Sequence, residues 1–368
     1  MRLLATFAVL AAATLAGCGS GDFDDQVPGG ATLTVYVSAP MRGESGDDGE
    51  DVVNGAKLAL ADADGEAGGV DVEAIYMDDT SGEGDDARWD PVVVADNARR
   101  AAQDSTAIAY VGELESGATR TSEPITNEAR MLQVSPASTA VDLTRDPQAA
   151  DDVPESLQPT GERTFGRVIP DDEKQAGAGA VWADQLGFKS AEVERDGSEY
   201  GDVVGDEFTE EAEALGISIG PTPELRYLAS EGDEFSITRL PAMATDAEFG
   251  PGTGLDFYVT SSAQAPEQLP VPAGQDFVKA YQEAYGEPPG RYAAYGYEAM
   301  AVVLDSIERA RDPRDRSAVI DAFFATDDRD SVLGIYSIAA TGDTTLDAIS
   351  GYLVEGKEPR FDSALTAP

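Results

Sequence analysis

The length, composition and charge of the chain limit what it can be. It has 368 residues, 42% of them hydrophobic and 26% charged, which is typical of a globular protein with room for two lobes and two cores. Its 70 acidic and 25 basic residues give a formal net charge of -45 at pH 7. Nucleic acid is therefore excluded as an expected partner, because phosphate binding needs a basic surface. The acidic excess fits either salty surroundings or a codon bias towards Asp, Ala, Gly and Arg.

Several kinds of chemistry are also unexpected. The sequence has no histidine and a single cysteine, Cys18, so it lacks the residues for a Ser-His-Asp or Cys-His nucleophile, a Cys-based zinc site or an internal disulfide. The sequence has no P-loop, no GxGxxG after a strand, no GxSxG elbow between a strand and a helix and no HExxH, and no two of its many carboxylates stand out as an acid–base pair. The acidic run Asp78–Asp86 lacks the spacing of an EF-hand, so we interpret it as a solvated loop rather than a calcium site. We expect no metal, no cofactor and no enzyme activity.

The N-terminal segment predicts secretion and a lipid anchor. One charge, Arg2, precedes an apolar and small run that ends at Gly17, too short to span a membrane but typical of a signal peptide. Leu15-Ala16-Gly17-Cys18 resembles the bacterial lipobox, in which the cysteine takes a diacylglyceryl group and becomes the mature N-terminus. The alternative is an ordinary signal peptide with a chance cysteine. We therefore predict a lipoprotein signal peptide over 1–17, a lipidated Cys18 and a Gly-rich tether over 18–30.

Strand-like and helix-like segments alternate along the rest of the chain. Asp90-Pro91 supplies a capping Asp and a first-turn Pro at the start of one helix, and Gly216 ends another. Alternation at this spacing predicts an α/β fold with parallel sheets and right-handed crossovers. The predicted strands are 32–38, 70–77, 107–111, 131–134, 165–169, 190–194, 217–219, 225–228, 256–260, 334–339 and 350–354, and the predicted helices are 50–62, 92–103, 173–186, 200–215, 273–285, 292–311 and 316–325, with one more opening at Ser116.

The stretch Val111–Leu143 predicts a ligand site. Two loops of small residues, one reaching Ser116-Gly117 and one over 135–139, leave the carboxyl ends of two neighbouring parallel strands. Ligands bind at such edges, and a helix that opens at Ser116 offers unpaired N–H groups to a carboxylate or another anion. The alternative is that Gly and Ser only connect strand to helix here.

Motifs along most of the mature chain resemble those of the type I periplasmic solute-binding proteins of the branched-chain amino acid (Leu/Ile/Val) group, which are receptors of ABC importers. The motifs occur in the order of that family. They are Val37-Ser38-Ala39-Pro40-Met41-Arg42-Gly43, Asn54-Gly55-Ala56-Lys57-Leu58-Ala59-Leu60, Tyr76-Met77-Asp78-Asp79, Val111-Gly112-Glu113-Leu114-Glu115-Ser116-Gly117, Val134-Ser135-Pro136-Ala137-Ser138-Thr139, Tyr200-Gly201 and Tyr292-Ala293-Ala294-Tyr295-Gly296-Tyr297-Glu298-Ala299.

This resemblance implies two Rossmann-like lobes joined by a hinge of three crossovers, with a ligand held in the cleft between them. Lobe 1 would comprise 31–165 and 262–332, and lobe 2 would comprise 166–261 and 333–361. The residues that would hold an amino acid's carboxylate and ammonium group, or contact it through nearby backbone, are Leu114, Ser116, Gly117, Ala137, Ser138 and Thr139, and Tyr200 would close over the ligand from lobe 2. The alternative for Tyr200 is a turn tyrosine that caps the following helix.

The second lobe departs from the family pattern. Only Ser236-Ile237-Thr238-Arg239 separate Phe235 from Leu240, where the family has a helix, a strand and another helix before the 242–244 region. We therefore expect a shortened lobe 2 that lacks a central βα unit, an aromatic ligand contact and an acid near Ala242. Two functions remain: an extracytoplasmic, lipid-anchored receptor that delivers a small polar or zwitterionic ligand to an ABC permease, or a non-transport sensor or surface interaction lipoprotein with an impaired cleft.

Overall fold

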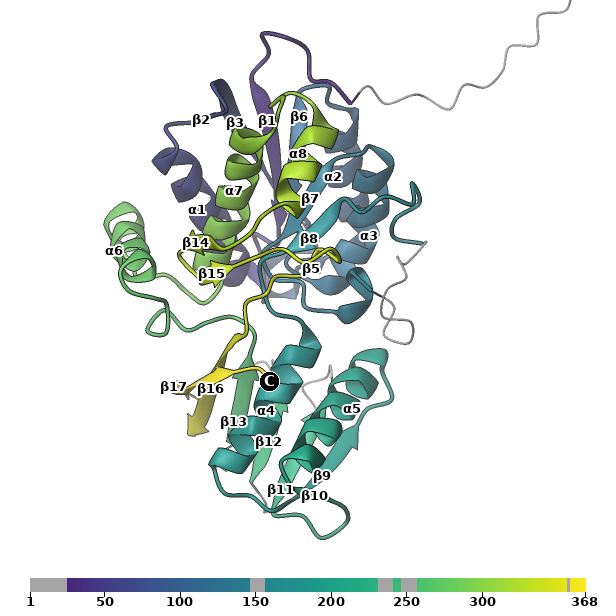
Figure 1. The fold of residues 1–368 in the computed structure, drawn as a ribbon, viewed down its shortest axis with the longest axis vertical. Helices are drawn as coiled ribbons and strands as arrows, with labels where there is room; N and C mark the ends of the chain where they lie inside the picture. The colour runs from purple at the N-terminus through teal and green to yellow at the C-terminus, as the bar shows by residue number, and fades with distance from the viewer. Residues whose placement is uncertain (1–24, 146–155, 231–240, 246–256, 356–357) are drawn as a thin grey trace, which may run out of the picture.

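The computed structural model describes residues 25–145, 156–230, 241–245, 257–355 and 358–368. Two sheets with their helices form two lobes, one above the other in Figure 1. We call the lobe around the six-stranded sheet lobe 1 and the lobe around the seven-stranded sheet lobe 2. In the described part of the chain, no helix has the length and apolar character needed to cross a membrane. The two-lobed α/β fold expected from the sequence is confirmed.

The sheet of lobe 1 has the strand order β2-β3-β1-β6-β7-β8. Every neighbouring pair is parallel except the short β2–β3 pair. Parallel strands buried on both faces are apolar along their length, and β1 and β6 are buried at every position. The bounds are β1 Leu33–Ala39, β2 Glu66–Ala67, β3 Val70–Asp78, β6 Ala107–Val111, β7 Leu132–Ser135 and β8 Phe165–Arg167, with a separate hairpin of β4 Thr80–Ser81 and β5 Arg88–Trp89 after the 3-10 turn η1 Gly84–Asp86.

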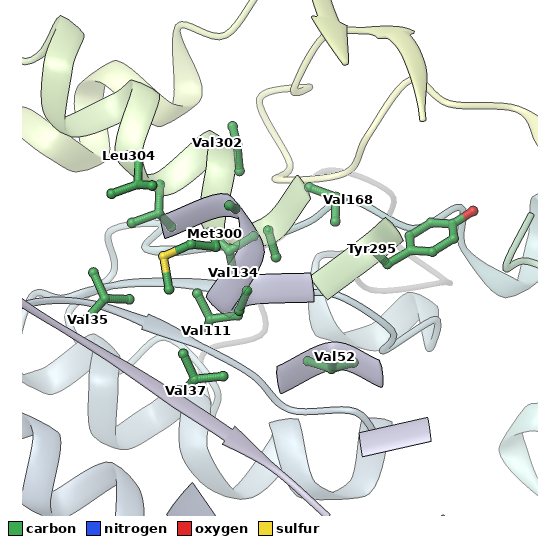
Figure 2. Close-up of a cluster of buried hydrophobic side chains, with 14 of the residues drawn as sticks. Val35, Val37, Val52, Val111, Val134, Val168, Tyr295, Met300, Val302 and Leu304 are labelled. Carbon is green, nitrogen blue, oxygen red and sulfur yellow. The ribbon is translucent and has the colours of Figure 1, made fainter. Parts of the chain in front are cut away.

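Helices cover both faces of this sheet. On one face α1, α7 and α8 pack against β1, β3, β6 and β7, and on the other α2 and α3 do so (Figure 1). The larger core lies under α1 and α7, where side chains from strands and helices interlock (Figure 2). The bounds are α1 Gly46–Asp62, α2 Pro91–Gln103, α3 Ser116–Glu128, α6 Ala273–Tyr285, α7 Ala293–Arg309 and α8 Arg316–Phe324, with a 3-10 turn η2 Val141–Leu143 and a hairpin of β14 Arg329–Ser331 and β15 Gly334–Tyr336.

Two predicted helix ends lie where the structure shows them, and the predicted residues form the caps. Asp90 caps α2, because its carboxylate accepts hydrogen bonds from the amides of Val92 and Val93, and a proline occupies the first turn. Gly216 follows the last turn of α5 with φ +84°, the left-handed backbone conformation that glycine adopts without strain. Both ends were predicted correctly from the sequence.

The sheet of lobe 2 has the strand order β10-β9-β11-β12-β13-β16-β17, parallel through β13 and antiparallel from there on. Helices α4 and α5 pack on one of its faces. Their apolar side chains surround Trp182, whose ring meets Tyr258 edge to face at 5.1 Å between centroids. The bounds are α4 Asp172–Gln185, β9 Ser190–Arg195, α5 Glu199–Ala214, β10 Ser218–Ile219, β11 Leu225–Ala229, β12 Ala242–Thr245, β13 Phe257–Ser261, β16 Ala348–Glu355 and β17 Glu358–Thr366.

Two connections between strands in lobe 2 are short. Residues Ala242–Thr245, which the family pattern places after a missing strand, form β12 in the middle of the sheet, paired in parallel with β11 and β13. The connections to these neighbours are 230–241 and 246–256, about the minimum length for a parallel crossover. Residues 231–240 and 246–256 lie outside the described part of the chain. In the described part of lobe 2 the centre of the sheet is occupied by β12, and the lack of a βα unit relative to the family stays a prediction.

Three crossings join the lobes. They follow β8 into α4, leave β13 towards α6, and run from β15 to β16. The first and third crossings are tied together by Arg167, which is fully buried and donates to Asp343 over 2.8 Å. Lys174 at the start of α4 donates to the carbonyl groups of Thr344 and Leu346, both at 2.8 Å. This arrangement is the expected hinge of three crossovers.

The described chain begins at the end of lobe 1 that is remote from lobe 2. Val27 is buried and its amide donates to the carbonyl of Arg314, just before α8. The guanidinium of Arg316 donates to the carbonyl of Ala107, at the start of β6. Because strands of the parallel sheet start there and end towards lobe 2, the N-terminal segment and the crossings lie at opposite ends of lobe 1.

Candidate functional site: the carboxyl edge of the first sheet

The first turn of α3 lies at the strand ends from which the crossings leave, and its amides are not capped. The N-cap residue is Glu115, whose side chain makes no capping hydrogen bond; one of its carboxylate oxygens instead accepts a hydrogen bond from the hydroxyl of Ser45 over 3.0 Å. The first amides of a helix have no partner inside the helix and form its positive end. This end of α3 is therefore suited to a carboxylate.

The two predicted loops lie side by side at this edge. The hydroxyl of Ser116 accepts a hydrogen bond from the amide of Ala140 over 3.2 Å, which links the start of α3 to the loop after β7. Thr139 is partly exposed, and among the described residues none forms a hydrogen bond with its hydroxyl. A threonine hydroxyl both donates and accepts, so this group can serve either pole of a zwitterion.

The serines next to these positions have an internal role. Ser135 at the end of β7 accepts from the amides of Ala137 and Ser138, and donates to the carbonyl of Glu113 over 2.8 Å. Ser138 is fully buried and its hydroxyl lies 2.7 Å from that of Thr119. Ser138 thus fixes the shape of the loop, while its predicted neighbours Ser116 and Thr139 are partly exposed.

Apolar and small residues border the polar groups. Leu114 and Ala137 are each 7% exposed and belong to the main core of lobe 1. A Cβ atom added to Gly117 would lie 2.8 Å from Cζ2 of Trp89, so the indole ring rests against the helix start. Trp89 was not predicted from the sequence. Its signal was weak: an isolated aromatic residue in a polar run, directly before the capping Asp90.

From lobe 2 the predicted aromatic Tyr200 meets a residue that the sequence did not single out. Tyr200 stands in the first turn of α5, and its hydroxyl lies 2.5 Å from that of Thr245, at the carboxyl end of β12. Thr245 could have been found only by placing 242–245 as a strand, since its position at a strand end makes it a candidate. The tyrosine hydroxyl therefore contacts another element of lobe 2 and does more than occupy a turn.

Charged side chains brace the loops from outside. Arg42 donates to Asp78 over 2.6 Å, and Asp78 accepts further bonds from the amide of Met41 and the hydroxyl of Thr80. Burial acts to raise the pKa of Asp78, but hydrogen bonds from Thr80 and Arg42 lower it below its ordinary value. Arg120 of α3 donates two hydrogen bonds of 2.7 Å to the carboxylate of Asp142. The second of these pairs ties the end of the Val111–Leu143 stretch to its helix.

The same loop is attached to the hinge. The carbonyl of Thr139 accepts a hydrogen bond from the amide of Asp172, the first residue of α4 in lobe 2. Arg167 donates to the carbonyls of Ser138 and Ala140 on either side, at 3.2 and 2.7 Å. A movement of α4 relative to lobe 1 therefore acts directly on the residues around Thr139.

The structure brings six of the predicted residues together and places the seventh in the other lobe. Leu114, Ser116 and Gly117 lie at the start of α3, and 137–139 form the adjoining loop. The predicted lipidation site, Cys18, lies outside the described residues. Across the described part of the chain, no cluster of acidic or cysteine side chains has the arrangement of a metal site. The chemistry on offer is hydrogen bonding and charge recognition of a small molecule.

Comparisons with known proteins agree with this fold. The family model for periplasmic binding proteins matches residues 32–236 and 226–356. A leucine-binding protein, LivK, from Thermotoga maritima shares 23% identity and a TM-score of 0.69, over 91% of this chain and 99% of the other. A substrate-binding protein of an ABC transporter from Desulfitobacterium hafniense, in complex with Leu, shares 20% identity and a TM-score of 0.72, over 90% and 100%.

LivJ from Streptococcus pneumoniae, a branched-chain amino acid transporter substrate-binding protein in complex with isoleucine, shares 16% identity and a TM-score of 0.69, over 92% and 100%. Among curated proteins no match is found. The structural similarities establish the two-lobed fold, and the family model covers most of the chain. The protein therefore belongs to the periplasmic binding protein family, whose members are extracytoplasmic solute-binding receptors rather than enzymes.

Proposed function

We propose that the protein is a lipid-anchored substrate-binding protein of an ABC importer, and that it holds a small polar or zwitterionic ligand, such as a branched-chain or other amino acid, between its lobes. The observation that supports this most strongly is the uncapped start of α3 beside the partly exposed residues Ser116 and Thr139. The first amides of α3 and the hydroxyls of Ser116 and Thr139, at one edge of the sheet, form a receptor for a carboxylate. Leu114, Gly117, Ala137 and Ser138 shape it, and Tyr200 closes over the ligand from lobe 2.

The ligands of two related structures fit such a receptor. The Desulfitobacterium protein holds Leu and the Streptococcus protein holds isoleucine. Both ligands carry a carboxylate, an ammonium group and an apolar side chain. On our proposal the carboxylate lies at the α3 start, and the hydroxyl of Thr139 serves the ammonium group.

The proposal also assigns an anchor and partners. Cys18 carries the lipid, residues 18–30 form the tether, and lobe 1 (31–165 and 262–332) and lobe 2 (166–261 and 333–361) close around the ligand before it passes to the permease. No metal or cofactor is required for binding. The family's location outside the cytoplasm supports this arrangement, since a receptor must reach both the solute and the permease at the membrane.

Isothermal titration calorimetry tests the ligand class directly. The purified soluble chain, without its first 18 residues, is titrated with leucine, isoleucine, valine, other amino acids, amides, urea and aromatic acids. We expect saturable binding of at least one carboxylate-bearing compound, and loss of that binding in Ser116→Ala. A folded protein that binds none of these compounds would contradict the proposal.

A second function is favoured by one observation, the short connections of lobe 2. Residues 230–241 and 246–256 leave little chain for the helices that usually follow strands in parallel sheets. A non-transport sensor or surface interaction lipoprotein needs a shaped lobe 1 but no full closure. Uptake of the bound ligand by cells that lack this protein separates the two: unchanged uptake favours the sensor, and reduced uptake favours the importer.

A further inference from the structure

Two carboxyl groups are buried beneath the ligand loops, and no described residue forms an ion pair with either of them. Asp79 follows the end of β3 and Glu113 follows β6 by two residues, and both residues are 0% exposed. The two side chains are within hydrogen-bonding reach of each other. Buried charges are costly unless they are paired or neutralised, so this site needs an explanation.

The pattern of hydrogen bonds shows what is missing. The hydroxyl of Tyr110 donates to Oε1 of Glu113 over 2.6 Å. Within the described part of the chain, no donor is bonded to Oε2 of Glu113 or to either carboxylate oxygen of Asp79. One proton on Asp79 supplies the donor that Oε2 lacks and removes the repulsion between two adjacent charges. We propose that Asp79 and Glu113 share a single proton at neutral pH, and that this acid–carboxylate pair positions the Val111–Leu143 loops.

The surroundings place the proton on Asp79. Glu113 accepts the phenol proton of Tyr110, which favours its ionised form, whereas Asp79 is faced by the negative groups of Asp78 and Glu115 as well as by Glu113. Burial raises the pKa of both carboxyls well above their ordinary values. Burial also raises the pKa of Tyr110, so its hydroxyl remains a donor.

Groups on every neighbouring element face the pair without neutralising it. The cation of Arg42 forms an ion pair with Asp78, the residue before Asp79. The other groups that face the pair or its partners are Ser38 of β1, Asn97 of α2, Asp78 of β3, Tyr110 of β6, Glu115 before α3, and Thr119 and Ser122 of α3.

The peptide of Glu113 connects the pair to the binding residues. Its amide donates to Thr119 over 3.2 Å, and its carbonyl accepts from Ser135 and Ser138 over 2.8 and 3.2 Å. These serines shape the loop that ends in Thr139. Loss of the shared proton puts a second charge in the buried site, and relief of the repulsion moves Glu113 and the loops attached to it.

The ligand-free protein tests the pair without reference to any ligand. Because the folded state holds a proton that the unfolded chain releases at ordinary carboxyl pKa values, the pair contributes stability that is lost as the pH rises towards its raised pKa. The melting temperature of the wild-type protein is measured from about pH 5 to about pH 9, beside Asp79→Asn and Glu113→Gln. In each variant an amide N–H replaces the shared proton, so we expect the melting temperature to fall less steeply with rising pH than in the wild-type protein.

Glu128→Gln is the matched control, since Glu128 is an exposed carboxylate on the neighbouring helix α3. The melting temperature of Glu128→Gln should fall with rising pH as that of the wild-type protein does. Equal slopes for the wild-type protein, Asp79→Asn and Glu113→Gln would overturn the proposal.

Two measurements remain decisive if an amide variant fails to fold. Infrared spectra of the wild-type protein and of Tyr110→Phe should show a protonated carboxyl band at neutral pH. The band should disappear as the pH is raised. In Tyr110→Phe it should disappear at a higher pH than in the wild-type protein, because ionised Glu113 has lost a hydrogen-bond donor. The fluorescence of Trp89, which rests against the α3 start, should change with the same midpoint. No protonated band at neutral pH, or one with the same midpoint in Tyr110→Phe, would contradict the shared proton.

A binding experiment extends the inference, and this part rests on the proposed function. L-leucine is titrated calorimetrically against the wild-type protein and Asp79→Asn on both sides of the midpoint. A second buried charge repels the ligand carboxylate, so wild-type affinity should fall roughly three- to tenfold at the higher pH while the affinity of the variant stays level. Absence of leucine binding at every pH would count against the proposed ligand, and the melting and infrared measurements on the ligand-free protein would still decide whether the pair shares a proton. Equal pH dependence in both proteins would disprove the link to binding.

Discussion

Hydroxyl groups of similar chemistry have different roles at the carboxyl edge of the first sheet. Those of Ser135 and Ser138 are fully buried and bonded within the loop. Those of Ser116 and Thr139 are partly exposed. Burial therefore separates the groups that build the site from those that can contact a ligand.

Replacing Thr139 with valine tests the second role. Valine keeps the volume and shape of the side chain, so the fold should persist, but the loss of one hydrogen bond to a bound ligand should weaken binding about tenfold. Calorimetry with the best ligand measures this change. Thr366→Val, on the exposed face of β17, is the control and should bind like the wild-type protein. Equal affinity in both variants would remove Thr139 from the site.

Asp343 in the third crossing predicts how the protein responds to acid. Burial acts to raise its pKa, but Arg167 and hydrogen bonds such as that from Thr341 lower it to about 2. Because the pKa of Asp343 is lower in the folded protein than in the unfolded chain, the ionised carboxylate stabilises the fold by about 2 kcal/mol at a pH above its unfolded pKa. This stability is lost as the pH falls through about 2. In urea denaturation between about pH 5 and pH 2, the free energy of unfolding should fall less steeply in Asp343→Asn than in the wild-type protein.

Asp321→Asn is the control for that experiment, because Asp321 is exposed on α8. It should keep the wild-type slope while Asp343→Asn is less stable at neutral pH, where the buried Arg167 has lost its partner. An unchanged slope in Asp343→Asn would show that this ion pair does not govern the acid limb.

Sequence reasoning predicted the residues of the candidate site that lie in one loop system and missed those that come from elsewhere in the fold. Ser116 and Thr139 follow strands with clear apolar patterns, so their position at a strand edge could be predicted. Trp89 comes from a two-residue strand and Thr245 from a four-residue strand. Strands this short carry no periodic signal, and their places depend on pairing with distant segments.

At the scale of elements, helices α1 and α7 pack unusually close. Glycines on both sides make this approach possible. A Cβ atom on Gly55 would overlap the carbonyl oxygen of Ala293 and lie 2.6 Å from the amide nitrogen of Tyr297, and one on Gly296 would overlap the carbonyl of Val52. The family motifs that contain Gly55 and Gly296 therefore report a helix contact as much as a ligand site.

Gly55→Ala should destabilise lobe 1. The added methyl group meets backbone atoms that cannot rotate away, so α1 and α7 must separate, at a cost of about 3 kcal/mol. Chemical denaturation gives the free energy of unfolding of the variant. For comparison, Gly220→Ala adds a methyl group with no atom within 4 Å and should unfold like the wild-type protein. A normal stability for Gly55→Ala would mean that the helix pair adjusts without loss.

Prediction of elements was best where periodicity and caps coincided. The strand over 107–111 and the start of α2 match the structure. The strand β17 was missed, because Glu358–Thr366 mixes charged, small and apolar residues without a clear period of two. Its place in the sheet comes from antiparallel pairing with β16, a contact that the local sequence does not encode.

The whole molecule has many like charges spread over two lobes. A net charge of -45 favours solubility but opposes compactness through self-repulsion. Ion pairs such as that of Arg145 with Asp171, 2.8 Å apart across the first crossing, offset this repulsion locally. The balance should depend on the salt concentration.

Raising NaCl from about 0.05 M to about 1 M should raise the melting temperature, because salt shortens the screening length from more than 10 Å to about 3 Å. Scanning calorimetry at constant pH measures the shift. The same series with sucrose in place of NaCl corrects for effects that do not involve charge. A melting temperature that falls with added salt would show that attractive ion pairs outweigh the repulsion.

The attachment of the N-terminal segment has a practical consequence for assays. Val27 is held beside the start of α8, and β1, seven residues long, runs from that end to the ligand loops, a distance of about 23 Å. A sensor chip or bead coupled upstream of Val27 would therefore hold the protein by the end opposite the proposed binding residues. Immobilisation at this end should leave access to the proposed site open, whereas coupling after β17 would attach the support to the second sheet, in lobe 2.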